Sequence, residues 1–249
     1  MSSSDTSSDP LRKDAPQKER KRHGARNTHK MKFFIRWLEE TFPHAFADKD
    51  GEHHILDVAG GGKGELATRL AWCHQLKVVI VDPRQTNVTQ CFEKTVLPQL
   101  PKKWQQRARE RSDISSVLDS RVSQLQKYFT QQNAVENVDD SESGLLSAIQ
   151  NATLFIGMHA DGAVEAIVDS AVHFSKPFVV VPCCVFPNLF HKRTITKQVK
   201  NENGITETKT VPVRSYEDFC QYLLDKDQRF RSTELPFPGR NLAIWWDGI

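Results

Sequence analysis

A glycine-rich loop between an apolar segment and an amphipathic one constrains the fold of this chain more than any other feature. The segment 54–58 is mainly apolar around Asp57, and four glycines follow it: Gly60, Gly61, Gly62 and Gly64. Such a loop lets a ligand approach the backbone and exposes the N–H groups that begin the next helix. We therefore expect a strand over 54–58, a helix over 64–75 and a ligand at the turn between them.

Strand and helix patterns alternate along the rest of the chain. Apolar, β-branched segments recur at 77–82, 153–159 and 177–182, and a helical pattern covers 162–174. This alternation predicts a doubly wound, Rossmann-like α/β fold with a mostly parallel sheet of about seven strands. The other expected elements are a helix over 31–42, a weak third strand near 121–128, a β-hairpin over 194–214 that turns at Asn203-Gly204, and a last strand over 241–246.

Two stretches differ in composition from this pattern. Residues 1–28 are Ser-rich and then basic, with almost no apolar side chain to bury, so we expect a disordered basic arm. The rest, 29–249, is expected to form one domain. Within it, an acidic, Ser- and Asn-rich stretch at about 133–147 is expected to be a flexible insertion.

Composition narrows the class of protein. There is no run of about 18 apolar residues to span a bilayer, and the N-terminus lacks the apolar core of a secretory signal. The five cysteines are odd in number and irregularly spaced, which argues against a disulfide framework. We expect a soluble intracellular protein, cytoplasmic or nuclear, with reduced thiols and no membrane partner.

Three nucleotide-type ligands compete for the glycine loop. A P-loop needs Ser or Thr after Lys63, but Gly64 follows it, so ATP hydrolysis is disfavoured. The dinucleotide fingerprint needs a third glycine where Glu65 stands, so NAD fits poorly. An acidic residue also ends the second strand, since Asp82 follows 77–81. Its carboxylate suits the two hydroxyls of a ribose; alternatively, it caps the turn that follows.

The loop resembles the S-adenosylmethionine (SAM)-binding motif of class I methyltransferases, in which a D-x-x-x-G-x-G-like run follows the first strand. The resemblance implies that the loop backbone lies against the amino-acid part of SAM and that the acidic residue ending the second strand binds the ribose. The cofactor-binding residues expected on this basis are Asp57, Ala59, Gly60, Gly61, Gly62, Gly64, Asp82 and Pro83.

Five strings in order, from about residue 28 to the C-terminus, also resemble a little-characterised group of eukaryotic predicted methyltransferases. They are LDVAGGGKGELA, VDPR, GMHADGAVEAIVDSA, VVPCCVFPNLF and LPFPGRN. The loop has one glycine more than the LDVAGGKGEL pattern of that group. The register of Gly60, Gly61 and Gly62 against the cofactor therefore stays open, and so does a catalytically silent protein.

The reacting methyl group is expected near the end of the fourth strand, because ligands of doubly wound sheets lie across the carboxyl ends of the strands. His159 and Asp161 are the candidates there for positioning an acceptor or removing its proton. Alternatively, Asp161 caps the next helix and His159 bonds a backbone group. Cys183 and Cys184 end the fifth strand, as buried thiols or as nucleophiles. These residues lack the paired spacing typical of zinc sites, so no metal is expected.

The acceptor is expected to be RNA. The paired cysteine resembles a motif of tRNA ribose 2′-O-methyltransferases, and the cations over 18–32, with Arg107, Arg109 and Arg111, suit phosphates. The sequence thus favours a SAM-dependent methyltransferase acting on tRNA or rRNA, with proteins and small molecules as other acceptors. The alternatives are a catalytically silent methyltransferase-like binding or assembly factor for RNA or protein, and an NAD-dependent oxidoreductase.

Overall fold

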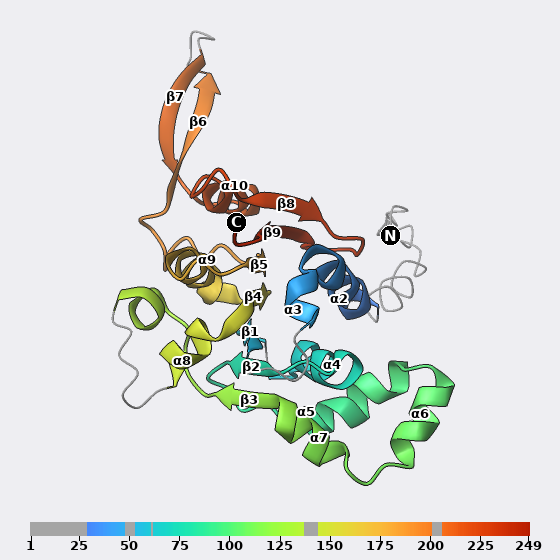
Figure 1. Cartoon of the computed structure of the whole chain (residues 1–249). Helices are drawn as coiled ribbons and strands as arrows, with labels where there is room; N and C mark the ends of the chain where they lie inside the picture. The colour runs from blue at the N-terminus through green and yellow to red at the C-terminus, as the bar shows by residue number, and fades with distance from the viewer. Residues whose placement is uncertain (1–28, 48–52, 61, 137–143, 201–205) are drawn as a thin grey trace, which may run out of the picture.

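The structure is a computed structural model, and it describes residues 29–47, 53–60, 62–136, 144–200 and 206–249 (Figure 1). The predicted basic arm over 1–28 lies outside the described residues. So do Gly61 of the glycine loop, the predicted hairpin turn Asn203-Gly204 and residues 137–143 of the predicted insertion.

A seven-stranded sheet runs through the molecule, with strand order β3-β2-β1-β4-β5-β9-β8. The neighbours from β3 to β5 pair in parallel, and β9 pairs antiparallel with both β5 and β8. This confirms the predicted doubly wound α/β fold with a mostly parallel sheet. The strands are β1 (His54–Val58), β2 (Val78–Val81), β3 (Val122–Leu125), β4 (Ala152–Met158), β5 (Phe178–Val181), β8 (Arg231–Glu234) and β9 (Leu242–Trp246).

The predicted helices over 31–42, 64–75 and 162–174 are present, with ends shifted by one or two residues. The described helices are α2 (Lys30–Thr41), α3 (Pro43–Ala47), α4 (Glu65–His74), α5 (Val88–Cys91), α6 (Lys102–Arg109), α7 (Ile114–Arg121), α8 (Leu145–Gln150), α9 (Val164–His173) and α10 (Tyr216–Leu224). Short helical turns lie at Phe92–Val96, Leu97–Gln99, Gln132–Glu136 and Asp161–Ala163.

Helices cover both faces of the sheet. Successive side chains of a strand point to opposite faces, and β1 follows this rule. Leu56 belongs to the hydrophobic cluster that contains Ile167 of α9, whereas Ile55 belongs to the cluster that contains Leu38 of α2 and Leu70 of α4. Because both faces are covered, the central strands are apolar throughout and the polar Asp57 inside β1 stands out.

Two elements near the C-terminus, α10 and β8, were not expected from the sequence. A capping box begins α10: Ser215 Oγ accepts a hydrogen bond from the Asp218 N–H at 3.0 Å, and the Asp218 carboxylate accepts one from the Ser215 N–H at 3.4 Å. The β8 strand lies at the sheet edge, and its sequence RSTE is mostly exposed. Its pairing with β9, not an apolar alternation, makes it a strand.

Both flanks of the predicted insertion pack on the core. Ala134, in the turn Gln132–Glu136, is fully buried, and Leu145 and Ile149 bury the inner face of α8. The flanks of the insertion predicted over about 133–147 are therefore part of the packed domain, and residues 137–143 lie outside the described part of the chain.

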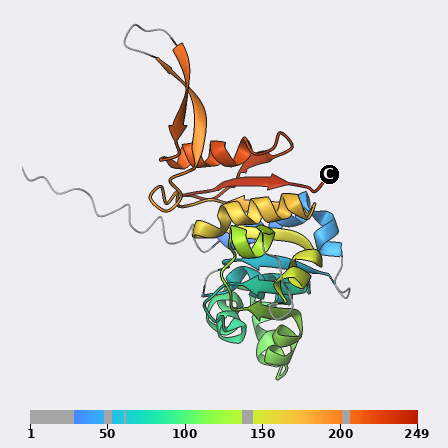
Figure 2. The same ribbon diagram turned by 90° about the vertical axis from the view of Figure 1, so that its left-hand side faces the viewer.

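A two-stranded ribbon of β6 (Thr194–Lys200) and β7 (Thr206–Pro212) confirms the predicted β-hairpin. It projects from the body at the β8 end of the sheet, whereas α5, α6 and α7 lie at the β3 end (Figures 1 and 2). Among the described helices, none combines the length and the apolar character needed to cross a membrane.

Candidate functional site

Among the described residues, six non-glycine residues adopt a positive φ, and three of them lie where β1 and β4 end. Ala59, His159 and Asp161 adopt left-handed conformations, with φ of 53°, 58° and 47°. Such conformations are unfavourable for residues with a Cβ and cluster at functional sites. The strain therefore marks the carboxyl edge of the sheet, where ligands of doubly wound folds bind.

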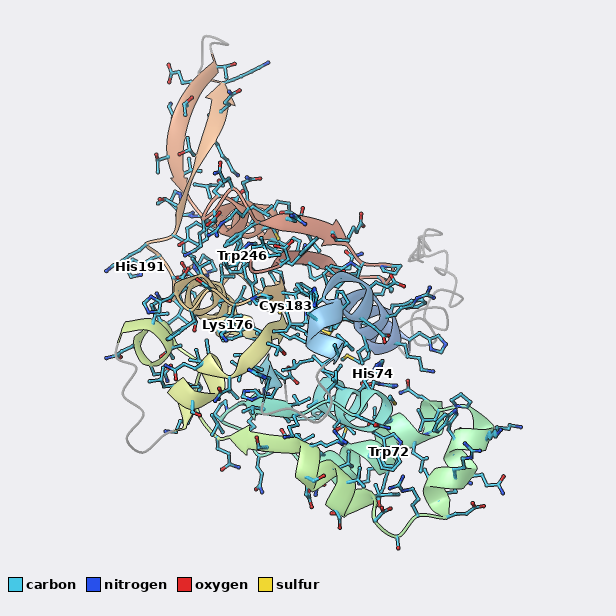
Figure 3. All side chains as sticks on the ribbon, in the orientation of Figure 1. Trp72, His74, Lys176, Cys183, His191 and Trp246 are labelled. Atoms are coloured by element: carbon cyan, nitrogen blue, oxygen red, sulfur yellow. The ribbon has the colours of Figure 1, made fainter. Side chains whose placement is uncertain are left out.

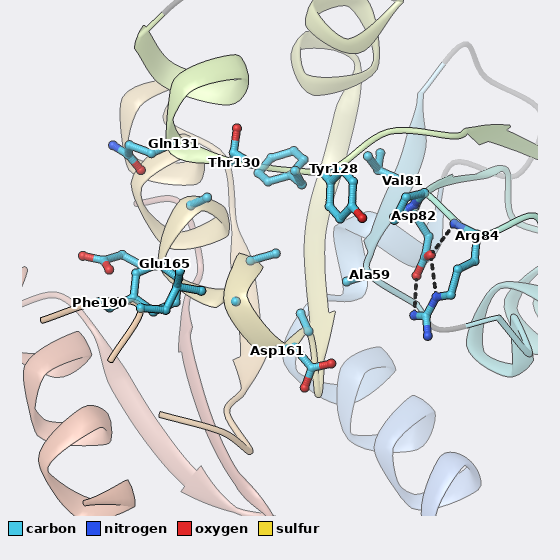
Figure 4. Close-up of a pocket in the computed structure, with 17 residues that line it drawn as sticks. Ala59, Val81, Asp82, Arg84, Tyr128, Thr130, Gln131, Asp161, Glu165 and Phe190 are labelled. Carbon is cyan, nitrogen blue, oxygen red and sulfur yellow. Dashed lines mark hydrogen bonds and ion pairs between the residues drawn. The ribbon is translucent and has the colours of Figure 1, made fainter. Parts of the chain in front are cut away.

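A cavity of about 640 Å³ opens at this edge (Figure 4), a volume within the usual range of small-molecule sites. Its wall includes Ala59 after β1, Asp82 and Pro83 after β2, and Asp161 after β4. Of the residues predicted to bind a cofactor or to act in catalysis, these four line the cavity. The other predicted residues do not line it, and Gly61 lies outside the described residues.

Asp57 is fully buried beside the glycine loop. Neither of its carboxyl oxygens has a hydrogen-bond partner in the described part of the chain. Burial first, and the nearby charge of Asp82 second, raise the pKa of Asp57 to about 7; the backbone N–H of Ala67 opposes this only in part. A Cβ added to Gly60 would lie 2.5 Å from Asp57 Oδ2, so a side chain there would force the loop or the carboxyl group to shift.

Asp82 is buried and forms an ion pair with Arg84. The guanidinium Nε and Nη2 donate to the two carboxyl oxygens at 3.0 and 2.9 Å, and the Arg84 N–H donates to Oδ1 at 2.9 Å (Figure 4). Asp82 thus caps the turn, as the alternative interpretation expected. The Arg84 side chain is 63% exposed, so it has room to leave if a ribose takes its place.

The other loop glycines are constrained unequally. Gly64 lies in the left-handed region, with φ of 58°, immediately before α4, and a Cβ there would collide with Thr86. Gly62 is exposed, and a Cβ on it would meet nothing within 4 Å. A Cβ would therefore be crowded at Gly60 and Gly64 but not at Gly62.

His159 contacts a residue that sequence reasoning did not single out. Lys30 Nζ, at the start of α2, lies within hydrogen-bond distance of His159 Nε2, and His159 Nδ1 is buried without a hydrogen-bond partner among the described residues. Burial, then the charge of Lys30, lowers the pKa of His159 to about 4, so the ring is neutral at pH 7. No local signal identifies Lys30, because 129 positions separate the two residues and Lys30 belongs to the basic run attributed to the arm.

The structure brings Asp161, Cys183 and Cys184 together. Cys183 Sγ lies 3.4 Å from Asp161 Oδ1 and 3.4 Å from Cys184 Sγ, near the start of α2 (Figure 3). Burial, the Cys184 thiol and Asp161 together raise the pKa of Cys183 to about 12. The thiol is therefore protonated, and nucleophilic attack by Cys183, which needs a thiolate, has no support in this geometry.

Three of the four residues of the metal alternative form a group. One ligand atom each of Asp161, Cys183 and Cys184 lies within 4.8 Å of the others. His159 is outside that group, and its Nε2 faces Lys30. The short approach within the group is accounted for by thiol hydrogen bonds, which need no metal.

Aromatic and aliphatic residues that the sequence did not indicate as site residues also line the cavity. Tyr128 after β3 and Leu189 in the loop after β5 are 71% and 68% exposed. Phe190 also lines the cavity, and the guanidinium of Arg193 stacks 3.6 Å from its ring centre. Arg193 Nε donates to Glu165 at 2.7 Å, which ties this loop to α9. Figure 4 shows Glu165 and Phe190 across the cavity from Asp82.

Glu165 is held in its charged form. Burial alone would raise its pKa, but hydrogen bonds from Tyr222 and Lys226 outweigh that effect and hold the pKa below its ordinary value. The Glu165 carboxylate is therefore engaged by protein groups, and Asp82 and Asp161 are the other acidic residues that line the cavity.

No protein-family model and no curated protein matches this chain. Among solved structures, it is similar to the methyltransferase domain of bacterial CtHen1-CN, at 12% identity, with 88% of this chain and 98% of that chain covered and a TM-score of 0.44. It is also similar to the glycopeptide N-methyltransferase MtfA complexed with sinefungin (12%; 88% and 92%; 0.39) and to geranyl diphosphate methyltransferase in complex with GPP and sinefungin (15%; 80% and 61%; 0.35). These likenesses are weak, so function has to be inferred from the residues of the site.

Proposed function

We propose that this protein is a SAM-dependent methyltransferase that binds its cofactor across the carboxyl ends of β1, β2 and β4. The observation that carries the proposal is the pair of buried carboxyl groups there, Asp57 without a hydrogen-bond partner among described residues and Asp82 in the cavity wall. SAM has a cationic ammonium and sulfonium and a ribose diol, and these groups complement two carboxylates.

Mutual repulsion of the two carboxyl groups supports a cationic ligand. The charge of Asp82 contributes to the raised pKa of Asp57, so full ionisation of both is unfavourable in the empty protein. A cation bound nearby would favour the ionised form of Asp57. Asp57 and the backbone around Gly60 would hold the amino-acid end of SAM, and Asp82 would hold the ribose once Arg84 has moved.

When bound, SAM supplies an electrophilic methyl group to an acceptor. Asp161 lines the cavity, is exposed and stands at the end of β4, so it is the residue placed to orient an acceptor and take its proton. His159 is neutral at pH 7, and its Nε2 contacts Lys30, which suits a positioning residue more than a base. The protonated Cys183 thiol donates to Asp161 and helps to orient it.

RNA is the acceptor class that we propose. The basic sequence over 18–26 leads directly to Lys30, which contacts His159 at the end of β4. A cationic segment joined to the mouth of the site would retain a polyanion by its phosphates without reading its sequence. Proteins and small molecules are the other acceptors to be tested.

Calorimetric titration with SAM, S-adenosylhomocysteine and NAD tests the cofactor. We expect micromolar binding of SAM, at least tenfold weaker binding in Asp57→Asn and in Asp82→Asn, and no binding of NAD. Asp113→Asn, at an exposed carboxylate paired with Arg111, is the matched control and should bind SAM like wild type. Binding of NAD in place of SAM would point to the oxidoreductase alternative.

A catalytically silent binding factor is the second candidate, and the Asp82–Arg84 pair favours it because Arg84 occupies the carboxylate that a ribose would need. Incubation of the protein with radiolabelled SAM and total tRNA or rRNA separates the two. Incorporation that disappears in Asp161→Asn supports the enzyme, whereas SAM binding or RNA binding without incorporation supports the silent factor.

A further inference from the structure

The helix α6 presents an unusual surface at the β3 end of the molecule. Its eight residues, KKWQQRAR, include four cations and no acid. Trp104 is 56% exposed, although tryptophan normally buries most of its large apolar surface. An exposed tryptophan on a cationic helix is typical of a binding surface rather than of a solvated face.

The charges of α6 are available to a partner. Within the described residues, none of its four cations forms an ion pair. The neighbouring charges are paired: Arg111 binds Asp113 at 2.7 Å, and Glu110 accepts a hydrogen bond from Gln106 at 3.1 Å. The cations of α6 are Lys102, Lys103, Arg107 and Arg109.

Helical spacing places an aromatic ring between cations. Residues three and four apart on a helix are neighbours, so Arg107 lies next to both Lys103 and Trp104. The Arg107 guanidinium carbon is 5.7 Å from the centre of the Trp104 ring. Ala108 is buried against the core, and Gln105 Nε2 donates to Leu100 O at 2.8 Å, so the helix presents this group from a fixed position.

Cations also connect α6 to the candidate site. Lys30 contacts His159 at the end of β4, and two residues later Lys32 Nζ donates to Gln99 O at 2.8 Å. Gln99 lies three positions before α6 and is itself held by Arg69 at 2.8 Å. The start of α2 therefore contacts both His159, after β4, and the segment that precedes α6.

We propose that α6 is a binding surface for single-stranded RNA, with phosphates on Lys103 and Arg107 and a base stacked on Trp104. Backbone cations together with an aromatic platform are the means by which proteins hold single strands without sequence preference. An acidic protein segment would satisfy the cations but would leave the indole without a flat partner. The binding needs neither SAM nor catalysis, so it stands whether or not the proposed methyl transfer does.

Fluorescence anisotropy of the full-length protein with a labelled oligouridylate of about 15 nucleotides tests this surface, a length that matches common single-strand sites. We expect the Kd to rise at least tenfold in the double variant Lys103→Glu/Arg107→Glu. The slope of log Kd against log salt should also fall by about 0.7 for each lost phosphate contact. Trp104→Ala should weaken binding about tenfold and leave the salt slope unchanged, whereas Trp104→Phe should retain most of the affinity.

The control is Lys209→Glu, which reverses a single cation on β7 at the opposite end of the molecule (Figure 1). A Kd within twofold of wild type in both the double variant and Trp104→Ala overturns the proposal. An equal loss of affinity in Lys209→Glu also overturns it. Equal affinity for a polyglutamate of matched charge, with no effect of Trp104→Ala, would instead identify an acidic protein as the partner. Thermal melting of each variant confirms that it is folded. Titration of SAM without RNA reports separately on the proposed function.

Discussion

The two sides of the cleft are built in different ways. The proposed cofactor side is assembled from short contiguous strings: Asp57 lies in β1 just before the glycine loop, and Asp82 with its turn follows the neighbouring strand β2. The proposed acceptor side is assembled from remote segments: Lys30 from α2, Asp161 after β4 and Cys183 after β5. A site made of local turns can therefore be predicted from a sequence, whereas a site made of long-range contacts cannot.

The first prediction tests how tightly the glycine loop packs against Asp57 on the proposed cofactor side. Gly60→Ala places a Cβ 2.5 Å from Asp57 Oδ2, so either the loop or the carboxyl group must shift. We expect SAM affinity, measured by calorimetry, to fall more than a hundredfold. Gly62→Ala is the matched control, because a Cβ there meets nothing within 4 Å. Equal losses in the two variants would show that the loop tolerates no side chain anywhere.

The next prediction concerns the acceptor side. Lys30→Met removes the cation beside His159, and methyl transfer at pH 7 should slow by about fiftyfold with SAM affinity unchanged, a loss typical of a positioning group. The pKa of His159, followed by NMR, should rise from about 4 but stay below 6.5, because burial is the larger cause of its depression. A loss of SAM binding in Lys30→Met would place Lys30 on the cofactor side instead.

The buried carboxyl group of Asp57 should also make the folding stability of the protein depend on pH. Its pKa is raised from 3.8 to about 7, so between these values the folded protein holds a proton that the unfolded chain has released. Stability should therefore fall as the pH rises from 4 to 7 and level off above. Without ligand, Asp57→Asn should be more stable than wild type by about 4 kcal/mol at pH 8 and by much less at pH 4.

Urea unfolding at the two pH values measures this difference. A variant less stable than wild type at pH 8 would mean that Asp57 forms hydrogen bonds when it is ionised. Addition of SAM should reverse the order at pH 8, because only the wild type retains the carboxylate that binds the cation.

The last prediction is a small change in the rate of methyl transfer when the Cys183 thiol is replaced. Cys183→Ser should change the rate of methyl transfer less than threefold, since a thiol with a pKa of about 12 is not a nucleophile at pH 7. Its role of donating to Asp161 is one that a hydroxyl can also perform. Abolition of activity, or a covalent adduct with RNA in the wild type, would instead restore the nucleophilic interpretation.

Much of the fold could be predicted, because burial on both faces makes parallel strands apolar over four to seven residues. That signal located β1, β2, β4 and β5 within one or two residues. It failed for β8, whose exposed residues gain strand structure only by pairing with β9. The corresponding helical signal, an apolar stripe, is absent from α6, whose charged sequence buries only Ala108.

Side-chain periodicity and turn chemistry are local, so the order of strands and helices, the glycine loop and the acidic residues at the ends of β1 and β2 could be recognised without a structure. The state of the charges could not: Asp57 is unpartnered among the described residues, Asp82 is paired with Arg84, and Lys30 lies against His159. Desolvation and electrostatic interactions depend on which segments meet in space. Those segments are up to 129 positions apart in this protein.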